Sequence, residues 1–401
     1  MNKYERILSS IKEQTPLLKM FERGVKPEEV RAAIIELLEP YFDNRDVLER
    51  FAIEALVPES INLLKLKEER PFFEMLEKCL YTYHCAKVKD SETCFKCCAD
   101  WQPKIVESVC KCWSVSHLEV DKDGLEIQEF LHECLSNIGD VVEGLMKPYL
   151  KVLLQQIRII RGSKITFREI ENLDLGGIVN ELIETSGYPD LFIPGPWGIR
   201  LNQWRNIAYH HSARAERDEI ICWWGKQPDI KEIELSRGEM LEVVHTNYEV
   251  YRVLHLAYTL FFIDNAKEFK RLCSSLKVEV RGEAEFLSFA AGLASLGFEI
   301  VELEKSSDEA RLVVKDVSNL EPDERRYHAS QFLFPLWHMT RSKKVITEYR
   351  EKDDTPNLLV SISSTICEKI FNGELEPLTL AKRMEMLDLK TKKIIPAWKD
   401  S

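Results

Sequence analysis

No stretch of this sequence is apolar over a length that could cross a bilayer. The longest nearly unbroken apolar run is "VLHLAYTLFFI" at residues 253–263, whereas a membrane-spanning helix needs roughly 20 apolar residues. The first residues, "MNKYERILSSIKEQ", have no apolar core of the kind that secretion signals carry. We therefore expect a protein that has no membrane partner and works in the cytoplasm.

The sequence also lacks an excess of positive charge. Its 401 residues include 55 Lys and Arg against 67 Asp and Glu, for a formal net charge of -12. Affinity for nucleic acid phosphates comes mainly from clustered cationic side chains, so a protein that coats nucleic acid with a broad basic surface is excluded. Two local basic segments are present, "TRSKKVITEYREK" around Tyr349 and "KRMEMLDLKTKK". They could touch RNA, although a solvated charged face is the simpler interpretation.

Several common catalytic signatures are missing as well. The sequence contains no phosphate-binding P-loop, no dinucleotide fingerprint after a strand, no HExxH and no GxSxG. Internal repeats and low-complexity tracts are also missing. We therefore expect no bound cofactor, and the chemistry has to come from other side chains.

Cysteine, by contrast, is abundant. Seven of the eleven cysteines fall within residues 79–112, without the regular spacing of a small secreted domain, which favours reduced thiols. Five of them lie in "CFKCCADWQPKIVESVCKCW": Cys94, Cys97, Cys98, Cys110 and Cys112. Their CxxC and CxC spacing could form a zinc site. The first and third, with Trp101 and Ile105, also fall at the steps of a buried helix face, and we favour that interpretation and assign no metal ligand.

The hydrophobic pattern predicts a mainly α protein in three parts. Residues 1–120 form a helical N-terminal region, Cys-rich at 79–112, because apolar residues recur there at three- and four-residue intervals. Residues 121–275 form a central helical bundle. Residues 276–401 form a small α/β domain, since short alternating segments replace the helical pattern there.

The central part has three long helical segments. They cover roughly residues 125–161, 167–186 and 236–271. Pro148 is expected to kink the first segment. The third begins with Ser236 as its cap and Glu239 in the matching position of a capping box. Before it, "EIICWWGKQPDIKEIEL" alternates as a short hairpin.

The last part alternates between strand and helix patterns. We expect strands at 276–282, 297–304, 310–317 and 355–364, with helices at 283–297 and 366–387. This domain carries no readable catalytic motif, so a recognition or regulatory role is the expectation for it.

The segment "QWRNIAYHHSA", residues 203–213, gathers Arg205, Asn206, His210 and His211 on what otherwise reads as a helix. In one straight helix, Arg205 and His210 would point about 140° apart, whereas residues four apart share a face. Asn206 could therefore orient the His210 imidazole. Convergence of the arginine and the histidine would need a bent backbone or a second chain.

An arginine beside a histidine, with no paired carboxylates or glycine-rich loop, suits chemistry on a phosphodiester. A guanidinium can neutralise and orient a phosphate, and an imidazole can exchange a proton near neutral pH. RNA supplies its own nucleophile in the 2′-OH, so no metal is required. The spacing alone is weak evidence, because an Arg and a His at this distance occur by chance in a chain of this length.

The segment "LNQWRNIAYHH" resembles the signature of the HEPN superfamily, in which four to six residues, the first usually polar, lie between an Arg and a His. The long helical segments on either side resemble the family's helical bundle in order and length, and the hairpin lies where such proteins often carry an insertion. The resemblance covers about 150 of the 401 residues.

This resemblance implies a metal-independent endoribonuclease that is active as a homodimer, with one composite site at the interface. Arg205 would stabilise the scissile phosphate, His210 would transfer protons, and Asn206 would position them. His211 also satisfies the spacing, so the choice between the histidines stays open.

Family members often serve as toxins or antiviral-defence effectors that cleave tRNA or mRNA, which would add an antitoxin or sensor protein as partner. Other members act as non-catalytic binding or assembly modules, and that alternative stays open too.

A second polar group lies on the last of the long helical segments. Its members approximately share a flank: His245, Tyr248, Arg252 and His255. They could line the same cleft as Arg205, but a polar and aromatic helix edge is the commoner explanation.

Overall fold

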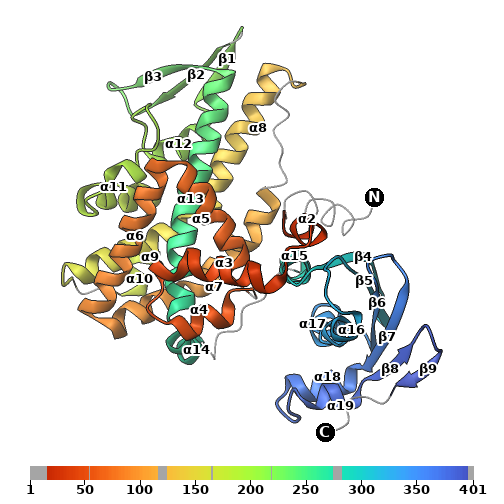
Figure 1. Ribbon diagram of the computed structural model, residues 1–401. Helices are drawn as coiled ribbons and strands as arrows, with labels where there is room; N and C mark the ends of the chain where they lie inside the picture. Colours follow the sequence, from red (N-terminus) through yellow and green to blue (C-terminus); the bar gives the residue numbers. More distant parts are fainter. Residues whose placement is uncertain are drawn as a thin grey trace. The chain divides into compact units, whose positions relative to one another are not determined.

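The computed structural model describes residues 16–53, 55–115, 124–163, 166–217, 219–273 and 282–395. The chain divides into two compact units. The larger unit comprises Leu38–Glu49 and Pro58–Val280 and is mostly helical. The smaller unit comprises Met1–Leu37, Arg50–Val57 and Arg281–Ser401 and contains a six-stranded sheet. The prediction of a mainly α protein with a sheet domain at its C-terminal end is therefore confirmed (Figure 1).

The predicted N-terminal region of residues 1–120 is shared between the two units. Helix α2 (Pro16–Glu22) packs against α15 (Gly282–Ser295) in the smaller unit. Helices α6 (Arg70–Lys89) and α7 (Ser91–Val115) instead belong to the larger unit. The periodicity of a helix shows that one of its faces is buried but not which part of the chain covers that face. The observed division of the chain into units therefore differs from the predicted one.

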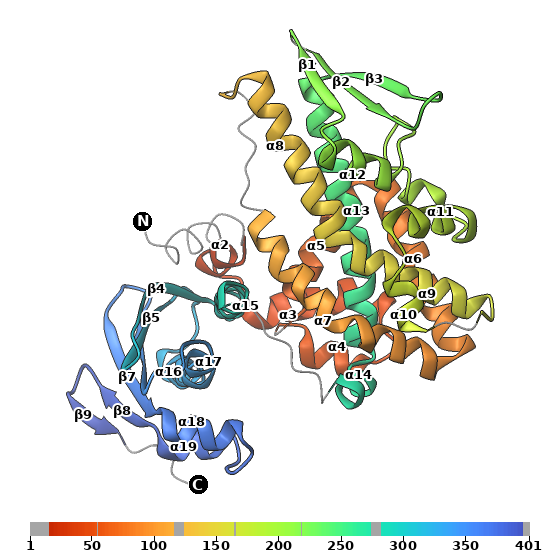
Figure 2. The same ribbon diagram turned by 180° about the vertical axis from the view of Figure 1, so that it is seen from behind.

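The larger unit is built around α13 (Arg237–Asp264). Figures 1 and 2 both show α13 running along the unit, and it packs against α6, α8 and α9. The remaining described helical elements of this unit are η1 (Glu39–Tyr41), most of α4 (Arg45–Phe51) and α5 (Val57–Glu68), α8 (Ile127–Gly139), η2 (Asp140–Met146), α9 (Lys147–Ile160), α10 (Phe167–Glu171), α11 (Leu175–Thr185), η3 (Pro189–Leu191), α12 (Leu201–Tyr209) and α14 (Ala266–Cys273). Among the described helices, none is long and apolar enough to cross a membrane.

The predicted start of α13 is confirmed. The Glu239 backbone N–H donates to the Ser236 hydroxyl at 3.2 Å, and the Ser236 backbone N–H donates to the Glu239 carboxylate at 2.8 Å. This reciprocal pair is a capping box, and it satisfies backbone donors that the first turn of a helix leaves free.

The first long segment is interrupted, although not as a simple kink at Pro148. Between α8 and α9 the chain forms a π-helix over Asp140–Met146, and Pro148 lies in the first turn of α9. Proline has no backbone N–H and its ring clashes with the carbonyl four residues earlier, that of Gly144. The π-helix over Asp140–Met146 has a wider turn than an α-helix, and it accommodates the clash and the missing N–H one turn before the proline.

The predicted hairpin is confirmed and extended by one strand. Strands β2 (Glu219–Trp224) and β3 (Lys231–Ser236) pair antiparallel, and β1 (Ala213–Glu216) adds to the other edge of β2. The sequence of β1, "ARAE", is short and has no hydrophobic alternation, which explains why the prediction missed it.

Within the described residues, the sheet of the smaller unit has six strands, which lie in the order of the sequence. They are β4 (Phe298–Lys305), β5 (Glu309–Asp316), β6 (Lys344–Arg350), β7 (Pro356–Ser363), β8 (Glu385–Asp388) and β9 (Lys393–Ile395). Only β5 and β6 pair in parallel, and the crossover between them carries α16 (Pro322–Ser330) and α17 (Leu333–Thr340), which pack against the sheet (Figure 1). The strands predicted at 297–304, 310–317 and 355–364 are confirmed, as is the helix before them, here α15.

Three predictions for the smaller unit either differ from the structure or fall on residues that it does not describe. The strand expected at 276–282 lies outside the described residues, except Gly282 at the start of α15. The helical tail is only partly correct, because α18 (Ser364–Phe371) and α19 (Thr379–Arg383) are followed by strand β8. Tyr349 is not a surface residue: it points inward from β6, is 1% exposed, and donates to Asp316 at 3.4 Å. Tyr349 therefore adds nothing to a surface that could touch RNA, which was the less favoured of the two interpretations of this segment.

Candidate functional site

The arginine–histidine segment lies on α12, which has one buried and one open side. Leu201, Trp204 and Ile207 are fully buried on the side that packs against α8. The intervening positions Arg205 and Asn206 are left on the open side. The three- and four-residue spacing of the apolar side chains thus determines which polar groups reach solvent.

Helix α12 ends at Tyr209, two residues before His211, the last histidine of the motif. Tyr209 is its last residue, His210 is the C-cap, and His211 adopts a left-handed backbone with φ of 49°. The Ser212 backbone N–H then donates to the Ile207 carbonyl at 3.0 Å. This bond from the second residue past the cap is the mark of a Schellman turn. Both histidines therefore leave the helix, and both are exposed.

His211 occupies a position that usually belongs to glycine. A non-glycine residue in the left-handed region costs on the order of 1–3 kcal/mol, and such residues gather at functional sites. A histidine here is therefore unfavourable for the helix end itself, which makes His211 a stronger candidate for function than its spacing alone suggested.

Arg205 is held by three neighbours. Its Nε donates to the Glu143 carboxylate at 2.9 Å, and its Nη1 donates to Asn206 Oδ1 at 3.0 Å. The guanidinium also lies over the Tyr209 ring, 5.4 Å from the ring centroid. The side chain keeps 30% of its surface exposed, so it is oriented yet accessible to a ligand.

The Asn206 side chain contacts one of the two side chains that it was predicted to position. Its side chain accepts a hydrogen bond from Arg205, whereas its link to His210 runs only through the backbone, where the His210 N–H donates to the Asn206 carbonyl at 2.9 Å. The described contacts thus make Asn206 a support for the arginine instead of the imidazole.

Glu143 is a site residue that the sequence prediction missed. It lies in the π-helix η2 and pairs with both Arg205 and Lys147. Burial acts to raise the pKa of Glu143, but the hydrogen bonds and charges of Lys147 and Arg205 outweigh it and hold the pKa below its ordinary value. The carboxylate is therefore ionised at neutral pH. No sequence signal connects residues 143 and 205, although short π-helical segments often occur at functional sites.

His132 is a second missed residue. It lies on α8, is exposed, and faces His211 with the ring centroids 6.4 Å apart and the ring planes 19° from parallel. Two imidazoles close to one another can supply both a proton acceptor and a proton donor. The packing of α12 on α8 brings them together.

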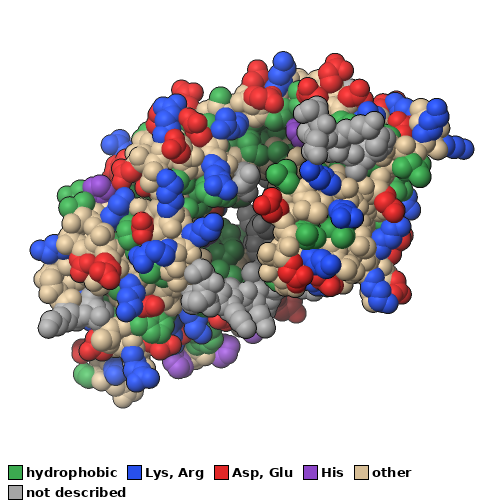
Figure 3. All heavy atoms as spheres, turned by 90° about the horizontal axis from the view of Figure 1, so that it is seen from below, with side chains coloured by type: hydrophobic (Ala, Val, Ile, Leu, Met, Phe, Trp, Pro, Cys, Tyr) green, Lys and Arg blue, Asp and Glu red, His purple; other side chains and the backbone are tan. Residues whose placement is uncertain are grey.

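The surface in view carries no broad basic area. On the face drawn in Figure 3, Lys and Arg side chains alternate with Asp and Glu side chains. This mixture agrees with the negative net charge of the sequence.

The polar group on α13 is bonded to residues other than those of α12. The bonds are His245 Nε2 to Glu69 at 3.2 Å, Tyr248 OH to Cys112 at 3.7 Å, Arg252 to Glu249, and His255 to both Tyr149 at 3.0 Å and Glu59 at 3.2 Å. These side chains form a half-buried polar network within the larger unit. This is the polar and aromatic helix edge that the sequence favoured.

Part of this network could in principle hold a cation. Within the described part of the chain, Glu69, His245 and Glu249 offer ligand atoms within 4.8 Å of one another. The Glu249 carboxylate is fully buried, however, and already engaged by the Arg252 guanidinium. A cation would have to compete with that fixed positive charge, so we assign no metal to the cluster.

The five cysteines considered as zinc ligands, at residues 94–112, all lie on one helix, α7. Four of the five cysteines considered as zinc ligands are buried, and Cys112 is half-buried. Burial raises the pKa of the Cys97 thiol to about 12, which favours the neutral thiol over the thiolate that zinc requires. Among the described residues, no group of cysteines is placed to share an ion. This arrangement supports the interpretation of the segment as a buried helix face.

Comparisons with known proteins found no match for this chain among family models, curated proteins or solved structures. What the protein does is therefore inferred from the geometry of its own residues.

Proposed function

We propose that this protein is a metal-independent endoribonuclease of the HEPN type. The observation that carries the proposal is the end of α12, where an oriented, accessible arginine precedes two exposed histidines by five and six positions, the second histidine in a strained backbone conformation. An anion-binding group next to proton-transfer groups is what cleavage of RNA through its own 2′-OH requires.

In the proposed reaction one imidazole removes the proton from the 2′-OH, and the 2′-oxygen forms a bond to phosphorus. The bond from phosphorus to the 5′-oxygen breaks, and a second imidazole protonates that leaving oxygen, so that a 2′,3′-cyclic phosphate and a free 5′-OH result. Arg205 neutralises the charge that develops on the phosphate. His210 and His211 both remain candidates for the first imidazole, and His132 beside His211 supports a role in the second transfer.

The fold of the larger unit is compatible with the family's bundle. Helices α8, α9 and α11 precede α12 in the chain, and the small sheet and α13 follow it, which is the order that the resemblance implies. We propose that two copies of the chain pair their α12 segments in one cleft, and that the protein acts on tRNA or mRNA as a toxin or antiviral-defence effector. An antitoxin or a sensor protein would then be its regulatory partner.

A second function has one observation in its favour. The ion pair between Arg205 and Glu143 accounts for the arginine without any substrate, as expected in a non-catalytic bundle that serves binding or assembly. In that case the histidines would be surface residues without a role in chemistry.

Incubation of the purified protein with tRNA and total RNA in EDTA tests the two functions. The ribonuclease should cleave under these conditions, because no step uses a metal. Arg205→Ala should lose on the order of 10²–10³-fold in rate, as expected for removal of one charge-stabilising group. Whichever of His210→Ala and His211→Ala removes the proton-transfer group should lose about 10²–10⁴-fold.

Arg168→Ala and His84→Ala are suitable controls, since both side chains are exposed on other helices of the same unit. They should cleave like the wild type. Equal cleavage by all variants, or none by the wild type, would contradict the ribonuclease and leave the assembly module as the better proposal.

A further inference from the structure

Tyr209 is an exposed aromatic residue at the end of α12. The other large apolar side chains of this helix are fully buried, namely Leu201, Trp204 and Ile207. Tyr209 instead keeps 49% of its surface exposed. It follows Arg205 by four positions, so both side chains lie on the same, open side of the helix. An aromatic ring therefore stands at the surface beside the arginine of the proposed site.

The ring is held in place by two neighbours. The Arg205 guanidinium lies 5.4 Å from the ring centroid. On α8, a Cβ at Gly139 would lie 3.4 Å from the ring carbon Cε2, so the missing side chain of the glycine lets the Tyr209 ring pack closely against this helix. A ring that is already fixed loses little conformational freedom when a flat ligand stacks on it.

The phenol adds no negative charge to the site. Burial, followed by the charges of Asp140 and Glu143, raises the pKa of Tyr209, and the charge of Arg205 offsets this shift only in part. The hydroxyl is therefore neutral at physiological pH and does not repel a phosphate that Arg205 binds.

The orientation of Arg205 does not depend on this ring alone. Two hydrogen bonds already fix the guanidinium, one from Nε to Glu143 and one from Nη1 to Asn206. A ring that served only to orient the arginine would also have no need to leave half of its surface open. A ligand-binding role accounts both for the position beside the guanidinium and for the exposure.

The dimensions of a nucleotide fit such a role. Only one sugar separates the charged phosphate from the flat base. If Arg205 binds the phosphate, a ring beside the guanidinium lies within reach of the base of the same nucleotide. Bases of every kind stack on aromatic side chains, provided that they are not already paired and stacked inside a duplex.

We infer that Tyr209 stacks on the base of the nucleotide whose phosphate Arg205 binds, so that the site selects unpaired nucleotides. This inference rests on the proposed ribonuclease function and adds a substrate-binding residue to it. Because stacking uses the face of the base, Tyr209 contributes affinity without choosing among the four bases.

A single-stranded 2′-O-methyl oligonucleotide tests binding separately from cleavage, because its blocked 2′-oxygen cannot attack the phosphorus. In fluorescence anisotropy with the full chain, Tyr209→Ala should weaken binding by about 5- to 150-fold, the range for loss of one stacked base. Tyr209→Phe and Tyr209→Trp keep an aromatic ring and should bind like the wild type. The same oligonucleotide annealed to its complement should bind more weakly, and Tyr209→Ala should not weaken it further.

An abasic position moved along the oligonucleotide locates the stacked base. At one position, loss of the base should weaken binding to the wild type as much as Tyr209→Ala does, and it should have no further effect on that variant. With cleavable RNA in EDTA, Tyr209→Ala should raise KM and leave kcat nearly unchanged, as expected for a residue that contributes to binding only.

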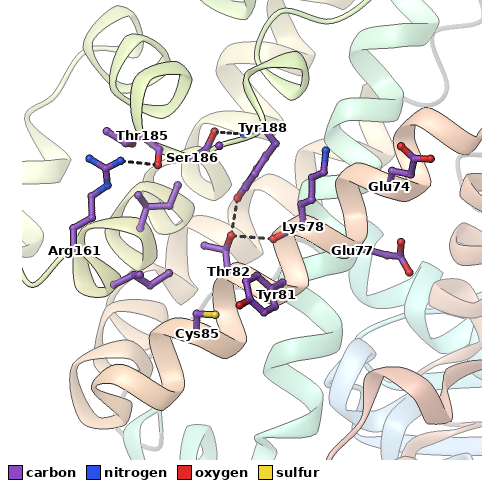
Figure 4. Close-up of a pocket in the computed structure, with 13 residues that line it drawn as sticks. Glu74, Glu77, Lys78, Tyr81, Thr82, Cys85, Arg161, Thr185, Ser186 and Tyr188 are labelled. Carbon is purple, nitrogen blue, oxygen red and sulfur yellow. Dashed lines mark hydrogen bonds between the residues drawn. The ribbon is translucent and has the colours of Figure 1, made fainter.

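Tyr81→Ala is the matched control. Tyr81 is 69% exposed on α6, and Figure 4 shows it beside Thr82 and Cys85 at a cavity to which α12 contributes no residue. This exposed tyrosine of the same unit lies outside the proposed site, so its replacement should leave both binding and cleavage unchanged.

The inference is overturned if Tyr209→Ala binds the single strand like the wild type, or if it loses the same factor on the complete, abasic and paired forms. It is equally overturned if size-exclusion chromatography shows a changed oligomeric state for Tyr209→Ala, because the ring would then be a contact between copies of the chain. Cleavage by the wild type together with an unaffected Tyr209→Ala overturns this inference alone. If the wild type neither cleaves RNA nor binds the oligonucleotide, the proposed ribonuclease function fails as well.

Discussion

At the scale of single residues, the end of α12 combines features that a simple helix end does not need. Arg205 is oriented by Glu143, Asn206 and Tyr209, and the chain then turns at His211 in a conformation that favours glycine. A histidine at this position lowers the stability of the folded protein locally, and the fold tolerates that loss. The cost can be measured independently of any activity.

We predict that His211→Gly stabilises the protein. Glycine adopts the left-handed backbone without steric penalty, and after subtraction of its larger entropy in the unfolded chain the free energy of unfolding should rise by about 0.5–1 kcal/mol. Denaturant unfolding measures the change. His210→Gly is the matched control, because φ is -94° there and the same replacement should destabilise. A loss of stability in both variants would contradict the assignment of strain to His211.

At the scale of the elements, the helix starts follow local rules more closely than the helix interiors. The start of α13 depends on two side chains three residues apart, Ser236 and Glu239, and it lies where the sequence placed it. The segment from α8 to α9 has an equally clear periodicity, but its π-helical interruption depends on how the chain accommodates Pro148.

We predict that Ser236→Ala lowers the free energy of unfolding of the larger unit by about 1 kcal/mol, because the first turn of α13 loses its cap. Hydrogen exchange should become faster at the Glu239 amide, which donates to the Ser236 hydroxyl. Ser236→Thr retains a hydroxyl oxygen and should stay close to the wild type. Equal effects of the alanine and threonine variants would show that the cap does not stabilise the helix.

At the scale of the whole molecule, the smaller unit is discontinuous in sequence. Helix α2 packs against α15, and Phe21 of α2 is fully buried, with a ring atom 3.6 Å from where a Cβ on Gly297 would lie. The first helix of the described chain is thus part of the core of a unit whose sheet begins nearly 280 residues later. This arrangement predicts which unit responds to a change near the N-terminus.

We predict that Phe21→Ala destabilises the smaller unit by about 3–5 kcal/mol, through lost burial and the cavity that remains. Hydrogen exchange followed by mass spectrometry should become faster in α15 and β4 and stay unchanged in α13. Phe269→Ala is the matched control, because Phe269 is 1% exposed and packs against Phe95 and Phe262 in the larger unit. The opposite pattern, with faster exchange in α13 after Phe21→Ala, would contradict the division of the chain.

The sequence by itself determined the helical character of most of the chain, the cap of α13, the hairpin of β2 and β3, and several strands of the smaller unit. These features depend on residues within a few positions of one another, so periodicity and turn chemistry suffice to predict them. The same local reasoning identified Arg205, Asn206, His210 and His211 as one candidate group.

Only the tertiary structure decided which distant residues join that group and how the helices are shared between the units. Glu143 and His132 reach the motif because α8 and η2 pack against α12, and α2 joins the smaller unit because it packs against α15. Burial of an apolar face is non-directional and favours any complementary partner, so a single sequence shows that a face is covered without showing by what.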